Sequence, residues 1–194
     1  MSEKRYIVGG RDGWLNIKRE LSGIIIAVPE YLQVELITTK DGRDYFTILE
    51  GVERGKKFSV KSGNLKNGNP GYQGSAQLQF SITKELLVYP GGQVKAVTDK
   101  TNPISDEKSH PIQIPDFPHN GGMGYLAHSA YAKNWFYLGH GHAVHGSDDR
   151  YLHTGTRSRG CITVEPSEWT RLYQYLILCR RGDLETVGMV VVVK

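Results

Sequence analysis

The chain has 194 residues, a formal net charge of +4 and 23 glycines. This length suits one domain, or a domain with a small addition, and can bury a hydrophobic core. Lys and Arg do not gather in blocks interleaved with aromatic residues, which argues against a nucleic-acid-binding protein. No apolar run approaches the length of a membrane span, and the opening MSEKRYIVGG does not read as a signal peptide.

The first half of the chain reads as a series of short strands. Its clearest runs of β-branched and aromatic residues span 31–39, 44–52 and 57–62. The Gly-, Asn- and Pro-rich segment 63–74 is predicted to be a loop and a domain boundary. We therefore expect a β-rich N-terminal segment of unknown role, residues 1–74, followed by a second domain, residues 75–194.

The second half continues with strands and then one helix. The predicted strands span 76–82, 85–90, 94–98, 111–117, 134–140, 150–153 and 187–193. Residues 141–149 read as a loop. An apolar face with helical spacing, from Trp169 to Ile177, predicts a helix over about 166–180. The chain is therefore predicted to be a mainly β protein with one substantial C-terminal helix.

The turn that contains Cys161 combines features of a nucleophilic cysteine. A thiolate is a strong nucleophile, and its pKa falls beside positive charge, which Arg157 and Arg159 supply. Gly160 allows the backbone to approach closely and to turn N–H groups toward an oxyanion. With an upstream histidine, these are the parts of a Cys/His acyl-transfer site, although the same spacing also suits a small buried thiol.

The run SRGCITV, residues 158–164, resembles the S-x-G-C-hydrophobic signature of the L,D-transpeptidases of YkuD type. The helix after the cysteine, the RRGD segment and the valine-rich last strand are similar to the C-terminal layout of that family. The hairpin LQFSITKELLVYPGGQVKAV is similar to its first strands. The resemblance covers residues 75–194, whereas residues 1–74 resemble no family.

The resemblance implies a β-sandwich-like fold and an enzyme that acts on the tetrapeptide stems of peptidoglycan. Cys161 would attack the peptide bond after the third stem residue, form a thioester with that residue and release D-Ala. An amine or water would then take the acyl group, giving transpeptidase or L,D-carboxypeptidase activity. The turn Ser158–Arg159–Gly160 would help to hold the oxyanion. The resemblance implies no cofactor and no metal.

Two histidines remain as candidates for the base. His145, in AVHG, precedes Cys161 by 16 residues, which is close to the family spacing. His153, in YLHTG, precedes it by 8 and ends a more regular strand. We favour His153 and keep His145 as the alternative. The family pattern often has histidine where this chain has Arg159, and arginine or asparagine where it has Thr163.

Two other functions stay open. The departures from the family pattern leave room for a non-catalytic cell-wall-binding module with the same fold. The three histidines of HGHAVH, residues 140–145, also suit zinc in a metal-dependent hydrolase. However, a valine stands where the metal-binding motif of metallo-β-lactamase-like hydrolases has aspartate. Asp148 and Asp149 fit a turn better than a catalytic role.

Several further side chains are candidates for a groove or for the core. Aromatic and polar residues that could line a sugar–peptide groove are Tyr125, His128, Trp135 and Tyr137. Trp135 also fits the core, and His119 lies on a loop that could approach the site. Cys179 is expected in the core. A helix between the two cysteines would hold them on the order of 20 Å apart, too far for a disulfide.

Because the substrate of this family lies outside the cytosol, we expect the chain to act at the periplasm or cell wall after export or delivery. A trimmed leader, recycling of wall fragments in the cytosol, and delivery as an antibacterial effector each fit this expectation. An effector would have an immunity protein and a secretion apparatus as partners.

Overall fold

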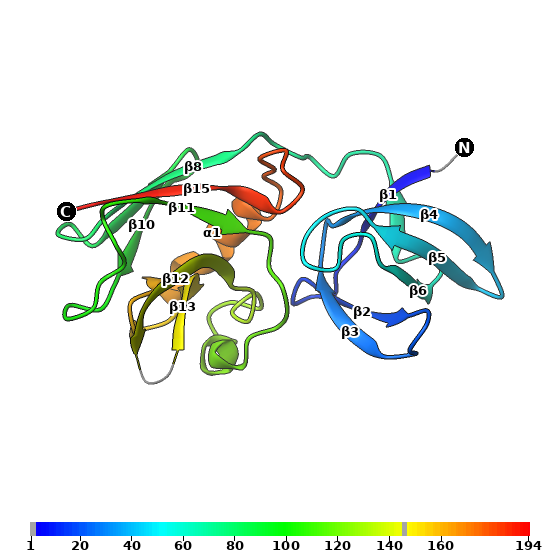
Figure 1. Ribbon diagram of the computed structural model, residues 1–194, viewed down its shortest axis with the longest axis horizontal. Coiled ribbons are helices and arrows are strands. Elements are labelled where there is room, and N and C mark those ends of the chain that lie inside the picture. The colour runs from blue at the N-terminus through cyan, green and yellow to red at the C-terminus, as the bar shows by residue number, and fades with distance from the viewer. Residues whose placement is uncertain (1–2, 145–146) are drawn as a thin grey trace.

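The computed structural model describes residues 3–144 and 147–194, so the candidate base His145 lies outside the described residues. Two β-sheets, one from each half of the chain, lie side by side (Figure 1). The prediction of a mainly β protein with a C-terminal helix is confirmed. Among the described residues, no helix is long and apolar enough to cross a membrane.

The first sheet is seven-stranded, and its neighbouring strands are antiparallel. Its strands are β1 (Glu3–Ile7), β2 (Trp14–Arg19), β3 (Ile25–Pro29), β4 (Gln33–Lys40), β5 (Arg43–Ile48), β6 (Lys57–Lys61) and β7 (Leu65–Asn67). Burial alternates along β5, where Phe46 and Ile48 face the core. Strands β1 to β3 were not predicted because polar residues interrupt their apolar ones, and β7 lies in the segment predicted as a loop.

The second sheet has eight strands, in the order β11-β15-β8-β9-β10-β14-β13-β12. They are β8 (Ala76–Ser81), β9 (Leu86–Tyr89), β10 (Gly92–Val97), β11 (Ser109–Gln113), β12 (Phe136–Val144), β13 (Ser147–Thr154), β14 (Ile162–Val164) and β15 (Thr186–Val193). Two pairs are parallel, β8 with β15 and β13 with β14. The predicted boundary at residue 74 falls between the sheets, and the division into two domains stays a prediction.

The helix is shorter than predicted. A 3-10 turn, η2 (Pro166–Glu168), leads into α1 (Trp169–Leu176), which lies in the second half of the molecule (Figure 1). The helix buries Trp169 and Tyr173, whose rings both lie 6.1 Å from that of Phe136 in the second sheet. The chain leaves the helix after Leu176. Arg180 then donates to the carbonyl oxygens of Ile177 and Cys179, at 2.8 and 2.7 Å, and satisfies these acceptors beyond the helix end. Cys179 is fully buried and a free thiol, as predicted.

The loop predicted over residues 141–149 is largely strand. Strand β12 continues to Val144 and β13 begins at Ser147, so Asp148 and Asp149 are strand residues rather than turn residues. The two strands pair with register shifts. Pairing with a partner strand overrides the low β-propensity of Gly, His and Asp in this segment.

One hydrophobic core extends through both sheets, and polar contacts fix one sheet to the other. The carboxylate of Glu50, fully buried in the first half, accepts from Arg180 Nε and Nη2 at 2.8 to 3.0 Å. Nη2 of Arg180 also donates to the carbonyl of Tyr31, in the first half, at 2.9 Å. A buried ion pair of this kind is costly to break, so it fixes the relative position of the halves.

Candidate active site

The parallel pair β13–β14 places His153 and Cys161 on one face of the sheet. His153 lies opposite Thr163 in the register. Side chains of a strand alternate between faces, so Cys161, two residues before Thr163, shares a face with Thr163 and with His153. Cys161 directly precedes β14, and strand pairing therefore brings it and His153, eight residues apart in sequence, to the same side of the sheet.

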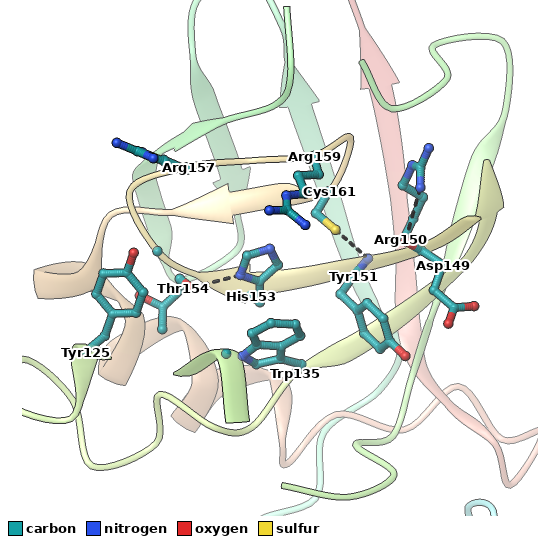
Figure 2. A pocket seen from close by; sticks show the side chains of 12 residues that line it. Tyr125, Trp135, Asp149, Arg150, Tyr151, His153, Thr154, Arg157, Arg159 and Cys161 are labelled. Atoms are coloured by element: carbon teal, nitrogen blue, oxygen red, sulfur yellow. Dashed lines mark hydrogen bonds between the residues drawn. The ribbon is translucent and has the colours of Figure 1, made fainter. Parts of the chain in front are cut away.

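Both side chains line a cavity of about 440 Å³. Figure 2 shows the His153 ring lying between Cys161 and the indole of Trp135. The lining residues are Gly121, Tyr125, Trp135, Asp149, Arg150, Tyr151, His153, Thr154, Gly155, Arg157, Arg159 and Cys161. Two of the four predicted groove residues, Tyr125 and Trp135, belong to this set. His128 and Tyr137 do not.

Cys161 is only 8% exposed, and burial raises the pKa of its thiol above the usual value. Two neighbours act in the opposite direction. The backbone N–H of Tyr151 donates to Sγ at 3.4 Å, and the positive charge of Arg150 favours the thiolate. Burial has the larger effect, so the resting residue is a neutral thiol at neutral pH.

The imidazole of His153 is oriented by two hydrogen bonds. Its Nδ1 lies 2.8 Å from the carbonyl oxygen of Thr154, and its Nε2 lies 3.2 Å from Oγ1 of Thr163. A carbonyl oxygen only accepts, so Nδ1 carries the proton and Nε2 presents a lone pair. Burial lowers the pKa of His153 to about 4, with a smaller effect from His119. The ring is therefore neutral at pH 7.

A column of aromatic rings supports the other face of His153. Trp135 stacks on His153 with ring centres 4.3 Å apart, and His119 stacks on Trp135 at 4.6 Å. His119 is fixed in turn by Asp116, whose carboxylate lies 3.0 Å from its Nε2. Trp135 Nε1 donates to the carbonyl of Ala132 at 3.0 Å. These contacts restrict rotation of the His153 ring.

The turn before Cys161 has a conformation that requires glycine. Gly160 has a φ of +98°, and a Cβ there would lie 2.7 Å from Arg150 Nε and 2.9 Å from the carbonyl oxygen of Asn102. The hydroxyl of Ser158 donates to the carbonyl oxygen of Cys161 at 2.8 Å. Ser158 and Gly160 therefore shape the loop that presents the cysteine.

The arginine beside the thiol is not one that the sequence indicated. Arg157 and Arg159 line the cavity as exposed side chains, whereas Arg150, which favours the thiolate, is only 3% exposed. Its guanidinium donates to the carbonyl oxygens of Asp149 and His142. Strand alternation that pairs Arg150 with buried Leu152 is the signal that could have identified it.

The histidines of segment 140–145 do not gather within the described residues. His140 is exposed, and its Nδ1 lies 3.4 Å from carboxylate oxygens of both Asp148 and Asp149. The group in the described part of the chain that could hold a metal is His140 with these two aspartates. His142 does not join it. The alternative of a zinc site made by three histidines includes His145, which lies outside the described residues, and His140 and His142 do not form a metal-binding group within them.

A family model of the L,D-transpeptidase catalytic domain (YkuD) matches residues 36–193. No curated protein and no solved structure gives a significant match. The matched region begins inside β4 and takes in β5 to β7 as well as the whole second sheet, so it reaches further than residues 75–194. It covers well over half of the sequence. The chain therefore belongs to the L,D-transpeptidase (YkuD) catalytic domain family, whose members act on peptidoglycan.

Proposed function

We propose that the chain is a cysteine-dependent L,D-transpeptidase or L,D-carboxypeptidase that acts on tetrapeptide stems of peptidoglycan. Cys161 is the nucleophile and His153 is the base. The observation that carries this proposal is the parallel pairing of β13 and β14, which brings a neutral thiol and a neutral imidazole to one cavity. A nucleophile and a base on one wall of a cavity are the minimum for acyl transfer.

Acylation begins with this neutral pair. Nε2 of His153 takes the Sγ proton as sulfur attacks the carbonyl carbon of the third stem residue. Backbone N–H groups at Gly160 and Cys161 donate to the oxyanion. The C–N bond then breaks, the imidazolium returns its proton to the departing amine of D-Ala, and a thioester remains on Cys161.

Deacylation repeats these steps with a new nucleophile. An amine gives a cross-link and water gives the free carboxylic acid, and in either case the incoming group loses a proton to Nε2 of His153. The thiolate leaves and is reprotonated. The bond from Nδ1 to the carbonyl of Thr154 holds the ring in the same tautomer for both halves of the reaction.

The charge of the cavity suits an anionic peptide. Arg157 and Arg159 both line it, and Figure 2 shows Arg159 beside Cys161 and Arg157 farther along the same loop. Peptide stems carry carboxylates, and a guanidinium group binds a carboxylate through paired hydrogen bonds. We propose that these arginines attract the stem, in place of the histidine and the arginine or asparagine that the family pattern often has near the cysteine.

The test is incubation of purified chain with muropeptides that carry tetrapeptide stems, read by mass spectrometry. Wild type is expected to release D-Ala or to form new cross-links, and Cys161→Ala and His153→Gln to lose these products. Cys179→Ala is the matched control, because this second cysteine is buried away from the cavity and should leave the products unchanged. If Cys179→Ala lost the products and Cys161→Ala kept them, the assignment of Cys161 as the nucleophile would be wrong.

The same assay distinguishes the enzyme from the alternative, a non-catalytic wall-binding module. That module requires wild type to give no product and Cys161 to stay unreactive toward iodoacetamide up to alkaline pH. It would still bind to purified cell walls in a sedimentation assay.

We propose further that the chain acts at the cell wall after export or delivery, and that it serves as an antibacterial effector. The support is chemical, because the family's substrate is the wall of bacteria. Directing the chain to the periplasm of a sensitive bacterium should arrest growth, and Cys161→Ala should not. A specific immunity protein should restore growth. Harmless accumulation of active chain in the periplasm would overturn the effector role.

A further inference from the structure

The first sheet extends a turn into the second half, close to the candidate base. Trp14, at the start of β2, is 7% exposed, and its Nε1 donates to Oδ1 of Asn134 at 2.6 Å. Asn134 is fully buried. This buried hydrogen bond joins two side chains that are 120 residues apart in sequence.

The backbone of this turn fits closely against the second half. Gly13 has a φ of +78°, and a Cβ there would lie 2.6 Å from the hydroxyl of Tyr173 and 2.8 Å from Nδ2 of Asn134. The carbonyl of Gly13 accepts from the backbone N–H of Glu30 at 2.8 Å. The carboxylate of Glu30 accepts from the hydroxyl of Tyr173 at 3.2 Å. The turn is therefore held by contacts on two sides.

Asn134 directly precedes Trp135, the residue whose indole packs on the imidazole. The backbone N–H of Asn134 donates to the carbonyl of Tyr131 at 3.0 Å, and Trp135 Nε1 donates to the carbonyl of Ala132 at 3.0 Å. The rings of Trp135 and His153 are 4.3 Å apart with an interplanar angle of 25°. Only one peptide unit thus separates the contact of the first sheet from the ring that supports the base.

We propose that Trp14 is a positioning residue of the active site. By holding Asn134 it fixes Trp135 against His153, and so the first sheet sets the orientation of the imidazole toward Cys161. The role of His153 as base rests on the proposed function, whereas the dependence of its orientation on Trp14 does not. Residues 1–74 then have a defined task, which is to complete the support of the catalytic face.

The test compares Trp14→Phe with Tyr72→Phe in the full chain. Trp14→Phe keeps an aromatic ring and removes the Nε1–H donor. Tyr72→Phe removes one donor from a bond within the first half, 2.6 Å to the carbonyl of Tyr31, beside the interface where Arg180 lies over the Tyr72 ring. This bond involves neither Asn134 nor Trp135. Titration of ¹⁵N-labelled histidine by NMR reports the tautomer and protonation of His153 without any substrate. Muropeptide turnover supplies kcat and KM.

We expect the His153 titration to move from about 4 toward the ordinary value of 6.5 in Trp14→Phe and to stay in place in Tyr72→Phe. We also expect kcat to fall about tenfold in Trp14→Phe with KM unchanged, because a small displacement of a reacting group lowers the rate without weakening binding. Asn134→Ser, which removes the acceptor of the same bond, should reproduce both effects and serves if Trp14→Phe folds poorly.

An unchanged His153 titration in Trp14→Phe and Asn134→Ser, or an equal shift in Tyr72→Phe, would overturn the proposal. Wild type that turns over no stem peptide would overturn the proposed function instead. The NMR comparison would still decide whether Trp14 positions His153.

Discussion

The hydroxyl oxygen of Thr163 lies 3.2 Å from Nε2 of His153, directly across the parallel strand pair. The same hydroxyl lies 3.5 Å from the carbonyl oxygen of Arg157, a second group to which it could donate. A hydroxyl donates to the lone pair of neutral His153 and, after rotation toward Arg157, accepts from the imidazolium. Thr163 is thus suited to both protonation states of the proposed base.

Thr163→Val keeps the shape of the side chain and removes the hydroxyl that donates to neutral His153 and accepts from the imidazolium. We expect kcat for stem peptides to fall about tenfold, because the imidazolium formed during acylation loses a hydrogen bond worth 1 to 2 kcal/mol. Steady-state turnover of muropeptides measures the effect. Thr163→Ser keeps the hydroxyl and should retain most of the activity. Equal losses in the two variants would show that the methyl group, not the hydroxyl, matters.

Acid should destabilise the fold through His153. Its pKa is about 4 in the folded chain and 6.5 when unfolded, so between these values the unfolded state binds a proton that the folded state does not. The contribution of neutral His153 to the free energy of unfolding is therefore fully present above pH 6.5. It is lost as the pH falls toward 4, which lowers the free energy of unfolding by about 3 kcal/mol. Urea unfolding at pH 7 and pH 4 measures the difference. His153→Gln should remove this part of the pH dependence. If wild type and His153→Gln lost the same free energy of unfolding between pH 7 and pH 4, the prediction would be wrong.

Cys161 should react as a neutral thiol with an adjacent base. Burial raises its pKa and lowers that of His153, so the pair does not form a thiolate–imidazolium ion pair at rest. The rate of alkylation by iodoacetamide should rise steadily with pH from 6 to 9 and be slow at pH 5. Mass spectrometry of the Cys161 peptide follows the reaction, with Cys161→Ser as the blank. A rate already maximal at pH 5 would demonstrate an ion pair.

Gly160→Ala should lower both stability and cysteine reactivity. The added Cβ meets Arg150 and the carbonyl of Asn102 at less than 3 Å, and the positive φ is strained for alanine. We expect a loss of about 1 to 3 kcal/mol in the free energy of unfolding. Gly124→Ala is the control, because a Cβ there has no heavy atom within 4 Å. Similar unfolding curves for the two variants would show that the turn tolerates a side chain.

The sequence predicted the elements whose own residues alternate and missed those formed by pairing. Strands β8, β9 and β15 carry apolar residues at the expected spacing, so their patterns were readable. The hairpin of β12 and β13 is rich in Gly, His and Asp, and only the partner strand makes it β. Helix α1 was predicted too long because its end depends on contacts of Arg180 that no local pattern contains.

In the candidate site, too, the features formed by residues close in sequence were predicted and those formed by distant segments were not. The motif around Cys161 was visible because Ser158 and Gly160 are close in sequence. The environment of His153 was not, since Thr163 faces it only through the parallel register and Trp135 stacks on it from a distant segment. Arg150 was missed because a buried arginine beside a thiol is recognised only when its neighbours in space are known.

Strand β15 (Thr186–Val193) lies between β11 and β8 in the second sheet, although it follows both of them in the sequence. A chain still attached to the ribosome would hold β8 and β11 with no strand between them. Its sheet would keep two open edges until residue 193 has emerged, and contacts between segments over 70 residues apart slow folding. A chain that stops before β15 would therefore leave the facing edges of β8 and β11 unpaired, and unpaired strand edges favour aggregation.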